Sequence, residues 1–131
     1  MSEMKIGLKG TKEMVVERKD LASFVGNIGA DVLATQRIVV LMERAAMNAI
    51  EGFLPEGKMT VGTMINMKHL AATPLGMRVR AEARLTEIDD RRLGFEVMVY
   101  DEFEKIAEGE NERFIVSVEK FLENVKKKQG T

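Results

Sequence analysis

The chain contains no cysteine and no tryptophan, and it has one histidine among its 131 residues. Without cysteine there are no disulfide bonds, no thiol nucleophile and no cysteine metal ligands. One histidine with scattered carboxylates does not make a zinc site, and neither a phosphate-binding Gly-rich loop nor a dinucleotide fingerprint occurs. We therefore expect no metal and no cofactor, so that any catalysis falls to carboxylates, hydroxyls and the single imidazole.

Long apolar runs and a strong net charge are also missing. The N-terminal run MSEMKIGLKG is not apolar enough for a signal peptide, and no stretch is long enough to span a bilayer. We therefore expect a cytoplasmic protein with no membrane partner. The formal net charge of −1 provides no electrostatic reason to expect a nucleic-acid partner. Length and composition, 45% hydrophobic and 31% charged, predict one soluble domain over residues 1–131.

Residues 35–51, TQRIVVLMERAAMNAIE, predict one helix that is apolar over most of its circumference. One stripe at helical spacing consists of Ile38, Leu41, Met42, Ala45 and Ala49, and a second consists of Val39, Val40, Ala46, Met47 and Ile50. Such a helix must be enclosed by a sheet or by a partner subunit. Glu43 is the exception. Its neighbours one turn away are apolar, so its carboxylate requires a partner.

The rest of the chain predicts an antiparallel sheet. Hydrophobic alternation and turn residues predict strands at 12–17, 58–70, 77–85, 92–101 and 106–118, with a loop at 19–34 and a short helix with a basic tail at 119–131. In the strand at 58–70 the odd positions Met59, Val61, Ile65 and Met67 are apolar, which predicts that His69 faces inward. Gly109 is interpreted as a possible bulge. Together the elements predict an α+β domain whose curved sheet wraps around one long helix.

Several motifs carry a resemblance to a known family. The runs ATQRIVVLMERAA, VGT, HLAATPLGMRVRAEARLTEIDDRRLGFEV and EGENERFIV occur in this order over roughly residues 30 to 121. This stretch resembles the hotdog-fold thioesterases, in particular the fluoroacetyl-CoA thioesterase-like group. The resemblance implies a hotdog fold, hydrolysis of an acyl-CoA substrate without a separate cofactor, and a homodimer with active sites at the subunit interface.

The resemblance also implies that Thr35, Glu43 and His69 are catalytic and that Gly62 lies beside the substrate. Independently, two polar groups aimed into one apolar core, Glu43 and His69, are more easily explained as partners than as accidents. The structural alternatives are an ion pair between these two that holds the helix on the sheet, and a helix N-cap role for Thr35. On one straight helix Thr35 and Glu43 would lie about 12 Å apart. Either Thr35 precedes the helix, or the two serve different parts of the site, across a dimer interface.

Three residues are predicted to bind substrate from outside this group. Phe24 is the one phenylalanine of the segment before the helix, where the fluoroacetyl specialist has several, so we expect an ordinary short acyl group. Arg78 and Arg80 share an exposed strand face and are assigned to the phosphates of coenzyme A, the alternative being a solvated face.

Two other functions remain open. A non-catalytic acyl-CoA sensor would need the pocket without the three polar residues. An enoyl-CoA hydratase would need an Asp beside the histidine, and His69 has none within ten residues in the sequence.

Overall fold

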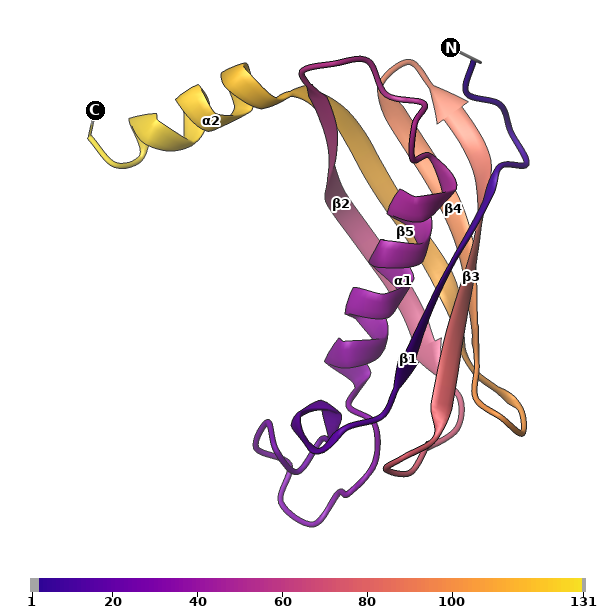
Figure 1. The fold of residues 1–131 in the computed structure, drawn as a ribbon. Coiled ribbons are helices and arrows are strands. Elements are labelled where there is room, and N and C mark those ends of the chain that lie inside the picture. Colours follow the sequence, from indigo (N-terminus) through magenta and orange to yellow (C-terminus); the bar gives the residue numbers. More distant parts are fainter. Residues whose placement is uncertain (1–2, 131) are drawn as a thin grey trace.

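The computed structural model describes residues 3–130 and shows one helix lying against a five-stranded sheet (Figure 1). The elements are β1 Lys9–Val15, a 3-10 helix at Arg18–Asp20, α1 Thr35–Ala49, β2 Lys58–His69, β3 Arg78–Asp89, β4 Arg92–Tyr100, β5 Lys105–Ser117 and α2 Val118–Lys127. The strand order is β1-β3-β4-β5-β2, and each neighbouring pair is antiparallel. The predicted α+β fold, a sheet curved around one long helix, is confirmed.

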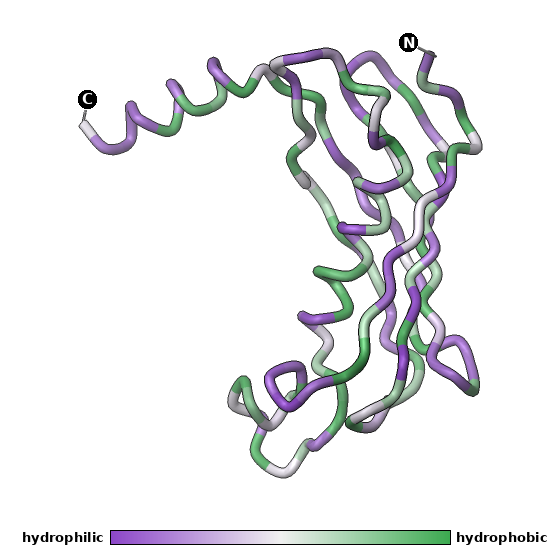
Figure 2. The backbone as a smooth tube through the Cα atoms, in the orientation of Figure 1, coloured by the Kyte–Doolittle hydropathy of each residue, from purple (hydrophilic) through white to green (hydrophobic). Residues whose placement is uncertain are grey.

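The core lies between α1 and the two central strands β3 and β4. Hydrophobic and hydrophilic residues alternate along these strands (Figure 2), and one face of each is buried. The buried residues include Val79, Ala81, Ala83, Leu85, Leu93, Phe95, Val97 and Val99, together with Ile38, Leu41, Met42, Ala45 and Ala49 of α1. Each fully buried Val, Leu, Ile or Phe contributes about 1.5–3 kcal/mol. This layer therefore determines where α1 sits on the sheet.

The first strand begins three residues earlier than the sequence predicted, because Gly10 does not interrupt it. Gly10 pairs with Ala83 inside β1. A Cβ at this position would lie 2.2 Å from the backbone nitrogen of Ala49, the last residue of α1. The glycine thus lets the end of the helix pack directly on the strand. The helix itself ends at Ala49 rather than at residue 51, because Ile50 leaves the helical conformation (φ −113°, ψ 10°).

The predicted facing of β2 is right for its second half and wrong for its first half. The pairing with β5 shifts register between Gly62 and Met64, which leaves one extra residue in β2. After this bulge the odd residues Ile65 and Met67 pack against the core, as predicted. Before it, Thr60 and Gly62 lie opposite the inward-facing residues of β5, so Met59 and Val61 face outward. A bulge reverses the side-chain alternation, which a uniform period of two cannot anticipate.

The bulge predicted at Gly109 is not present. Gly109 pairs in register with Met67 on one side and with Val97 on the other. A glycine is needed at position 109 because β2 and β5 approach each other closely there: a Cβ would lie 1.9 Å from the backbone oxygen of Asn66.

Two apolar surfaces remain uncovered in the single chain. Val40 and Met47 on α1 are exposed, so the sheet encloses only part of the helix. Helix α2, predicted from residue 119, begins at Val118 and projects away from the sheet (Figure 1). None of its residues is buried. Thr131, at the end of the predicted tail, lies outside the described residues. No described helix is long and apolar enough to cross a membrane.

Candidate active site

Thr35 and His69 meet where α1 begins and β2 ends. Thr35 Oγ1 lies 2.9 Å from His69 Nδ1. The helix N-cap is Ala34, so the N-cap role considered for Thr35 is wrong: Thr35 is the first helical residue. The second ring nitrogen, Nε2, is buried and has no hydrogen-bond partner in residues 3–130. An orphaned buried nitrogen costs about 1–3 kcal/mol unless another group meets it, which makes this imidazole a candidate for contact with a ligand.

The start of α1 is suited to stabilise negative charge on an oxygen. Thr35 is exposed, so its hydroxyl is accessible from outside the chain. The first backbone N–H groups of a helix have no partner within it, and the helix dipole places partial positive charge there. A carbonyl oxygen that gains negative charge during acyl transfer is stabilised by donors of this kind.

Glu43 has a partner that sequence reasoning missed. Its Oε2 lies 3.0 Å from Nη1 of Arg113 on β5, and Arg113 is buried. The guanidinium also donates to Thr60, from Nε to Oγ1 at 2.9 Å and from Nη2 to the backbone oxygen at 3.2 Å. The Glu43 side chain retains 32% exposure. Arg113 therefore fixes the orientation of the carboxylate, and the carboxylate remains accessible from solvent. One signal in the sequence could have identified this partner: Arg113 is a charged residue at an inward-facing position of the last strand.

Gly62 lies directly against the Glu43 carboxylate. It pairs with Arg113, and a Cβ there would lie 2.5 Å from Glu43 Oε2. The glycine therefore lets the β2 backbone approach the carboxylate. The bulge that follows is held by Asn111, whose side-chain nitrogen donates to the backbone oxygen of Met64 at 2.9 Å.

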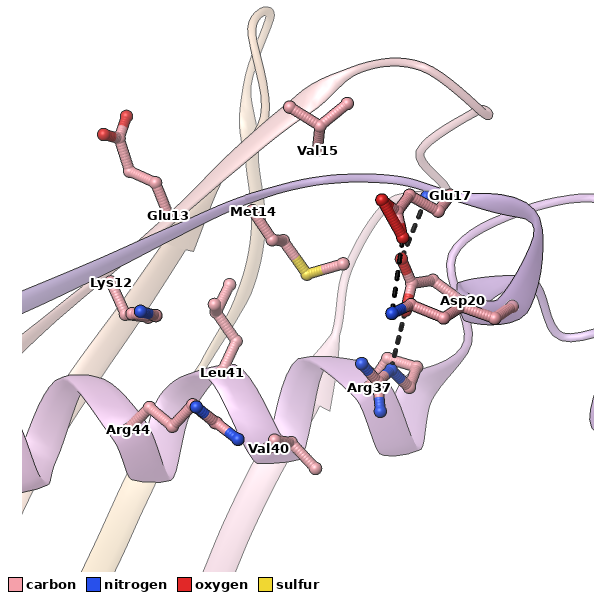
Figure 3. A pocket seen from close by; sticks show the side chains of 11 residues that line it. Lys12, Glu13, Met14, Val15, Glu17, Asp20, Arg37, Val40, Leu41 and Arg44 are labelled. Carbon is pink, nitrogen blue, oxygen red and sulfur yellow. Dashed lines mark hydrogen bonds and ion pairs between the residues drawn. The ribbon is translucent and has the colours of Figure 1, made fainter.

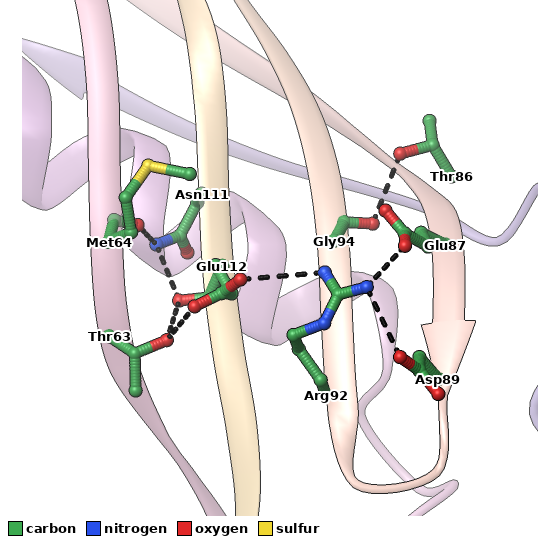
Figure 4. A network of polar contacts seen from close by, with 9 residues as sticks. All are labelled: Thr63, Met64, Thr86, Glu87, Asp89, Arg92, Gly94, Asn111 and Glu112. Atoms are coloured by element: carbon green, nitrogen blue, oxygen red, sulfur yellow. Dashed lines mark hydrogen bonds and ion pairs between the residues drawn. The ribbon is translucent and has the colours of Figure 1, made fainter.

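A polar network on the outer face of the sheet supports the same bulge (Figure 4). Thr63, the extra residue, donates to Glu112 Oε2 at 2.7 Å, and Arg92 joins Glu112 to Glu87 and Asp89. The hydrogen bond and charge of Arg92 lower the pKa of Glu87 below its ordinary value. The contribution of this pair to stability is thus present above the ordinary pKa and is lost only as the pH falls through the lowered one.

The side chains of Glu43 and His69 do not contact each other within one chain. No hydrogen bond or ion pair in residues 3–130 joins Glu43 to His69, so the ion pair considered as a structural alternative is absent within one chain. Because Thr35 and Glu43 lie on the same helix, eight residues apart, about 12 Å separates them. Of the two explanations considered, that Thr35 precedes the helix is wrong. The remaining one is that they serve different parts of the site.

A groove lies between β1 and α1, and the segment before the helix is attached at one end of it (Figure 3). It has a volume of about 380 Å³ and includes the exposed Val40. At one end the buried Asp20 accepts hydrogen bonds from Arg37 Nε at 2.8 Å and from the backbone nitrogen of Glu17 at 2.9 Å. These bonds fix the beginning of the loop that leads to Thr35.

The three other predicted substrate contacts are distributed differently. Phe24 is 66% exposed in the loop at the end of the molecule where α1 begins. Arg78 and Arg80 lie on the outer face of β3, and β4 and β5 separate that strand from β2. Arg80 pairs with Glu82 at 3.3 Å. The single chain does not bring either arginine to Thr35, Glu43 or His69, and both assignments stay predictions.

Five surface grooves in the described part of the chain are lined entirely by residues other than Thr35, Glu43 and His69. Within residues 3–130, no group of three or more His, Asp or Glu side chains is arranged to hold a metal ion.

Solved structures of other proteins share this fold. The fluoroacetyl-CoA thioesterase FlK matches with a TM-score of 0.88 and 32% identity over 99% of both chains. An FlK variant in complex with fluoroacetate and CoA matches with a TM-score of 0.85, over 90% of this chain and 99% of that one. A Thermus thermophilus protein described as a thioesterase superfamily member matches with a TM-score of 0.91 and 29% identity, over 99% and 96% of the two chains. The expected hotdog thioesterase fold is confirmed.

The sequence comparison agrees with the fold. Residues 16–119 match the family model of FlK, the fluoroacetyl-CoA-specific thioesterase. The fluoroacetyl-CoA thioesterase of Streptantibioticus cattleyicolor is 34% identical over 120 residues, which cover 92% of this chain and 83% of that protein. The protein therefore belongs to the fluoroacetyl-CoA thioesterase family of the hotdog fold.

Proposed function

We propose that this protein hydrolyses a short-chain acyl-CoA to the free acid and coenzyme A. Thioester hydrolysis follows from its membership of the family. The observation that carries the proposal is the Glu43 carboxylate, which Arg113 orients and Gly62 leaves accessible. A solved relative holds fluoroacetate and CoA, the two products of its thioester. We also propose that the protein acts in the cytoplasm, as its sequence predicts.

Glu43 is the proposed base or nucleophile. As a base it removes a proton from water, the resulting hydroxide adds to the thioester carbonyl carbon, and the C–S bond breaks. As a nucleophile it attacks that carbon itself, which releases the thiolate and forms an anhydride that water then hydrolyses. In both routes His69 delivers a proton to the thiolate or assists Glu43, and a proton it gives up is replaced by one from the water that is consumed. Thr35 and the first N–H groups of α1 stabilise the negative oxygen.

A homodimer is proposed because β2 forms an exposed edge of the sheet. Its outer edge carries unpaired backbone groups over twelve residues, which is an arrangement that favours pairing with another strand. Met64 leaves apolar surface on this strand, and Val40 and Met47 leave more on the exposed side of α1. A two-fold axis that pairs β2 with its copy would complete the site by placing Glu43 of one subunit with the Thr35–His69 pair of the other.

Subunit mixing tests the shared site. Glu43→Gln and His69→Ala dimers are each expected to be nearly inactive. When the two are unfolded together and refolded, we expect roughly a quarter of wild-type turnover, because about half of the dimers are mixed and each contains one intact site. Light scattering on the wild type should show a dimer at micromolar concentration. A mixture that stays inactive, or an active monomer, would exclude the shared site.

Thr35 variants separate chemistry from packing. Since Thr35 is not the N-cap and is exposed, Thr35→Ala should change the free energy of unfolding by only about 0.5 kcal/mol. Its turnover should fall clearly, whereas Thr35→Ser keeps the hydroxyl and should retain most activity. Thermal melts and thioester turnover of both variants provide the check. An Ala variant with wild-type turnover would remove Thr35 from the catalytic residues.

A panel of acyl-CoA substrates of increasing chain length, monitored for free thiol release, tests the function directly. We expect turnover of short acyl chains, with no strong preference for fluoroacetyl over acetyl, because Phe24 is the one phenylalanine in the loop at 21–33. Acyl-CoA binding in calorimetry without thiol release would instead indicate a binding module. Hydration of an enoyl-CoA without thiol release would indicate a hydratase.

A further inference from the structure

We infer that helix α2 docks on the second copy of this chain and covers the end of that copy where α1 begins. The inference rests on the dimer proposed above. Its starting point is that no residue of α2 is buried within its own chain. Ten isolated residues form only a marginal helix in water, and helices of this length depend on packing of an apolar face.

Such a face is present and only partly covered. Phe121, Leu122 and Val125 share one side of α2, Phe121 is half-buried, and polar residues occupy the other sides. Leu122 is 49% and Val125 is 44% exposed. The helix points past β2, away from the rest of the chain (Figure 1), so that most of its length lies outside the sheet.

The place where α2 begins determines which surface it can reach. The backbone nitrogen of Val118 bonds to the oxygen of Gly57 at 3.0 Å, so α2 starts beside the first residue of β2. In an antiparallel pair of β2 strands, this end lies next to His69 of the partner subunit. Neighbouring strands are about 4.8 Å apart and α2 is about 15 Å long. The helix therefore extends beyond the partner's β2 strand.

A matching apolar surface lies at that end of the molecule. Phe24 and Ile28 of the loop at 21–33 are exposed, Ile28 at 94%, and Leu70 directly follows His69. Phe24 also lines a groove of about 360 Å³ together with Leu21 and Leu75. The apolar side of α2 and this surface are two halves of one contact. In the dimer each α2 thus closes over the loop that borders the partner subunit's Thr35.

Disulfide trapping tests the contact, because the natural chain has no cysteine. Phe24→Cys is combined in turn with Phe121→Cys, Leu122→Cys or Val125→Cys. After mild oxidation we expect covalent dimers on a non-reducing gel for at least one pair. The matched controls combine Phe24→Cys with Lys120→Cys or Lys127→Cys, on the opposite side of α2, and should give far less. The loop at 21–33, which contains Phe24, and α2 lie at opposite ends of the molecule (Figure 1), so a bond between them reports a second subunit.

A second measurement does not depend on thiol geometry. Leu122→Glu with Val125→Glu should weaken the dimer by about tenfold or more in sedimentation. The control Lys120→Gln with Lys127→Gln makes the same change in net charge and should leave the dimer unchanged. A wild-type dimer that gives no disulfide with any pair and is insensitive to the two glutamates would overturn the docking of α2 alone. A monomeric wild type would overturn the dimer as well, while the acyl-CoA panel still decides the hydrolysis.

Discussion

Replacing Glu43 by glutamine is expected to lower thioester turnover by a factor on the order of 10² or more, because a general base or nucleophile is lost. The fold should tolerate the change. Removing one partner of a fully buried ion pair costs about 3–5 kcal/mol. Here the cost should be smaller, since Glu43 is 32% exposed and Arg113 keeps its bonds to Thr60. Turnover and thermal melts of the same preparations provide the measurement.

Two variants sharpen this test. Glu51→Gln makes the same charge change at an exposed position just beyond α1, and should leave turnover unchanged. Gly62→Ala should lower turnover with little loss of stability, since its Cβ would displace the flexible end of the Glu43 side chain rather than backbone. If Glu43→Gln instead melts at a much lower temperature but turns over normally per folded molecule, the carboxylate is structural and its catalytic assignment must be withdrawn.

Gly109→Ala should cause a large loss of stability. The new Cβ would lie 1.9 Å from the backbone oxygen of Asn66 and 2.7 Å from Cα of Met67. Backbone atoms of β2 cannot move aside unless β2 separates from β5. We expect the free energy of unfolding to fall by about 3 kcal/mol or more and the melting temperature by about 10 °C or more.

The matched control is Gly94→Ala on the neighbouring strand β4. Its Cβ would lie 3.2 Å from Cβ of Glu87, a contact that a shift of a few tenths of an ångström relieves, so the loss should stay near about 1 kcal/mol or less. Equal melting temperatures for the two variants would show that β2 and β5 are not packed as closely at Gly109 as the structure indicates. Because β2 carries both Gly62 and His69, loss of its pairing should also abolish turnover.

The helix and the central strands could be predicted from the sequence because their signals are local. The apolar spacing around Leu41 identified α1, and the alternation in residues 77–85 and 92–101 identified β3 and β4 with their buried faces. Both signals are repeated within the element itself. Thr35, Glu43 and His69 were selected partly by family resemblance and partly because Glu43 and His69 interrupt apolar patterns.

The sequence alone determined the class of fold and the family, and it supplied Thr35, Glu43 and His69 as candidates for catalysis. The tertiary structure decided how these residues are grouped. It placed Thr35 with His69 and Glu43 with Arg113, and it reversed the facing of β2 at the bulge after Gly62. The physical reason is that contacts between residues 34 or 70 positions apart, and the register of one strand on another, depend on where distant segments pack. No repeating pattern within a single element encodes that information.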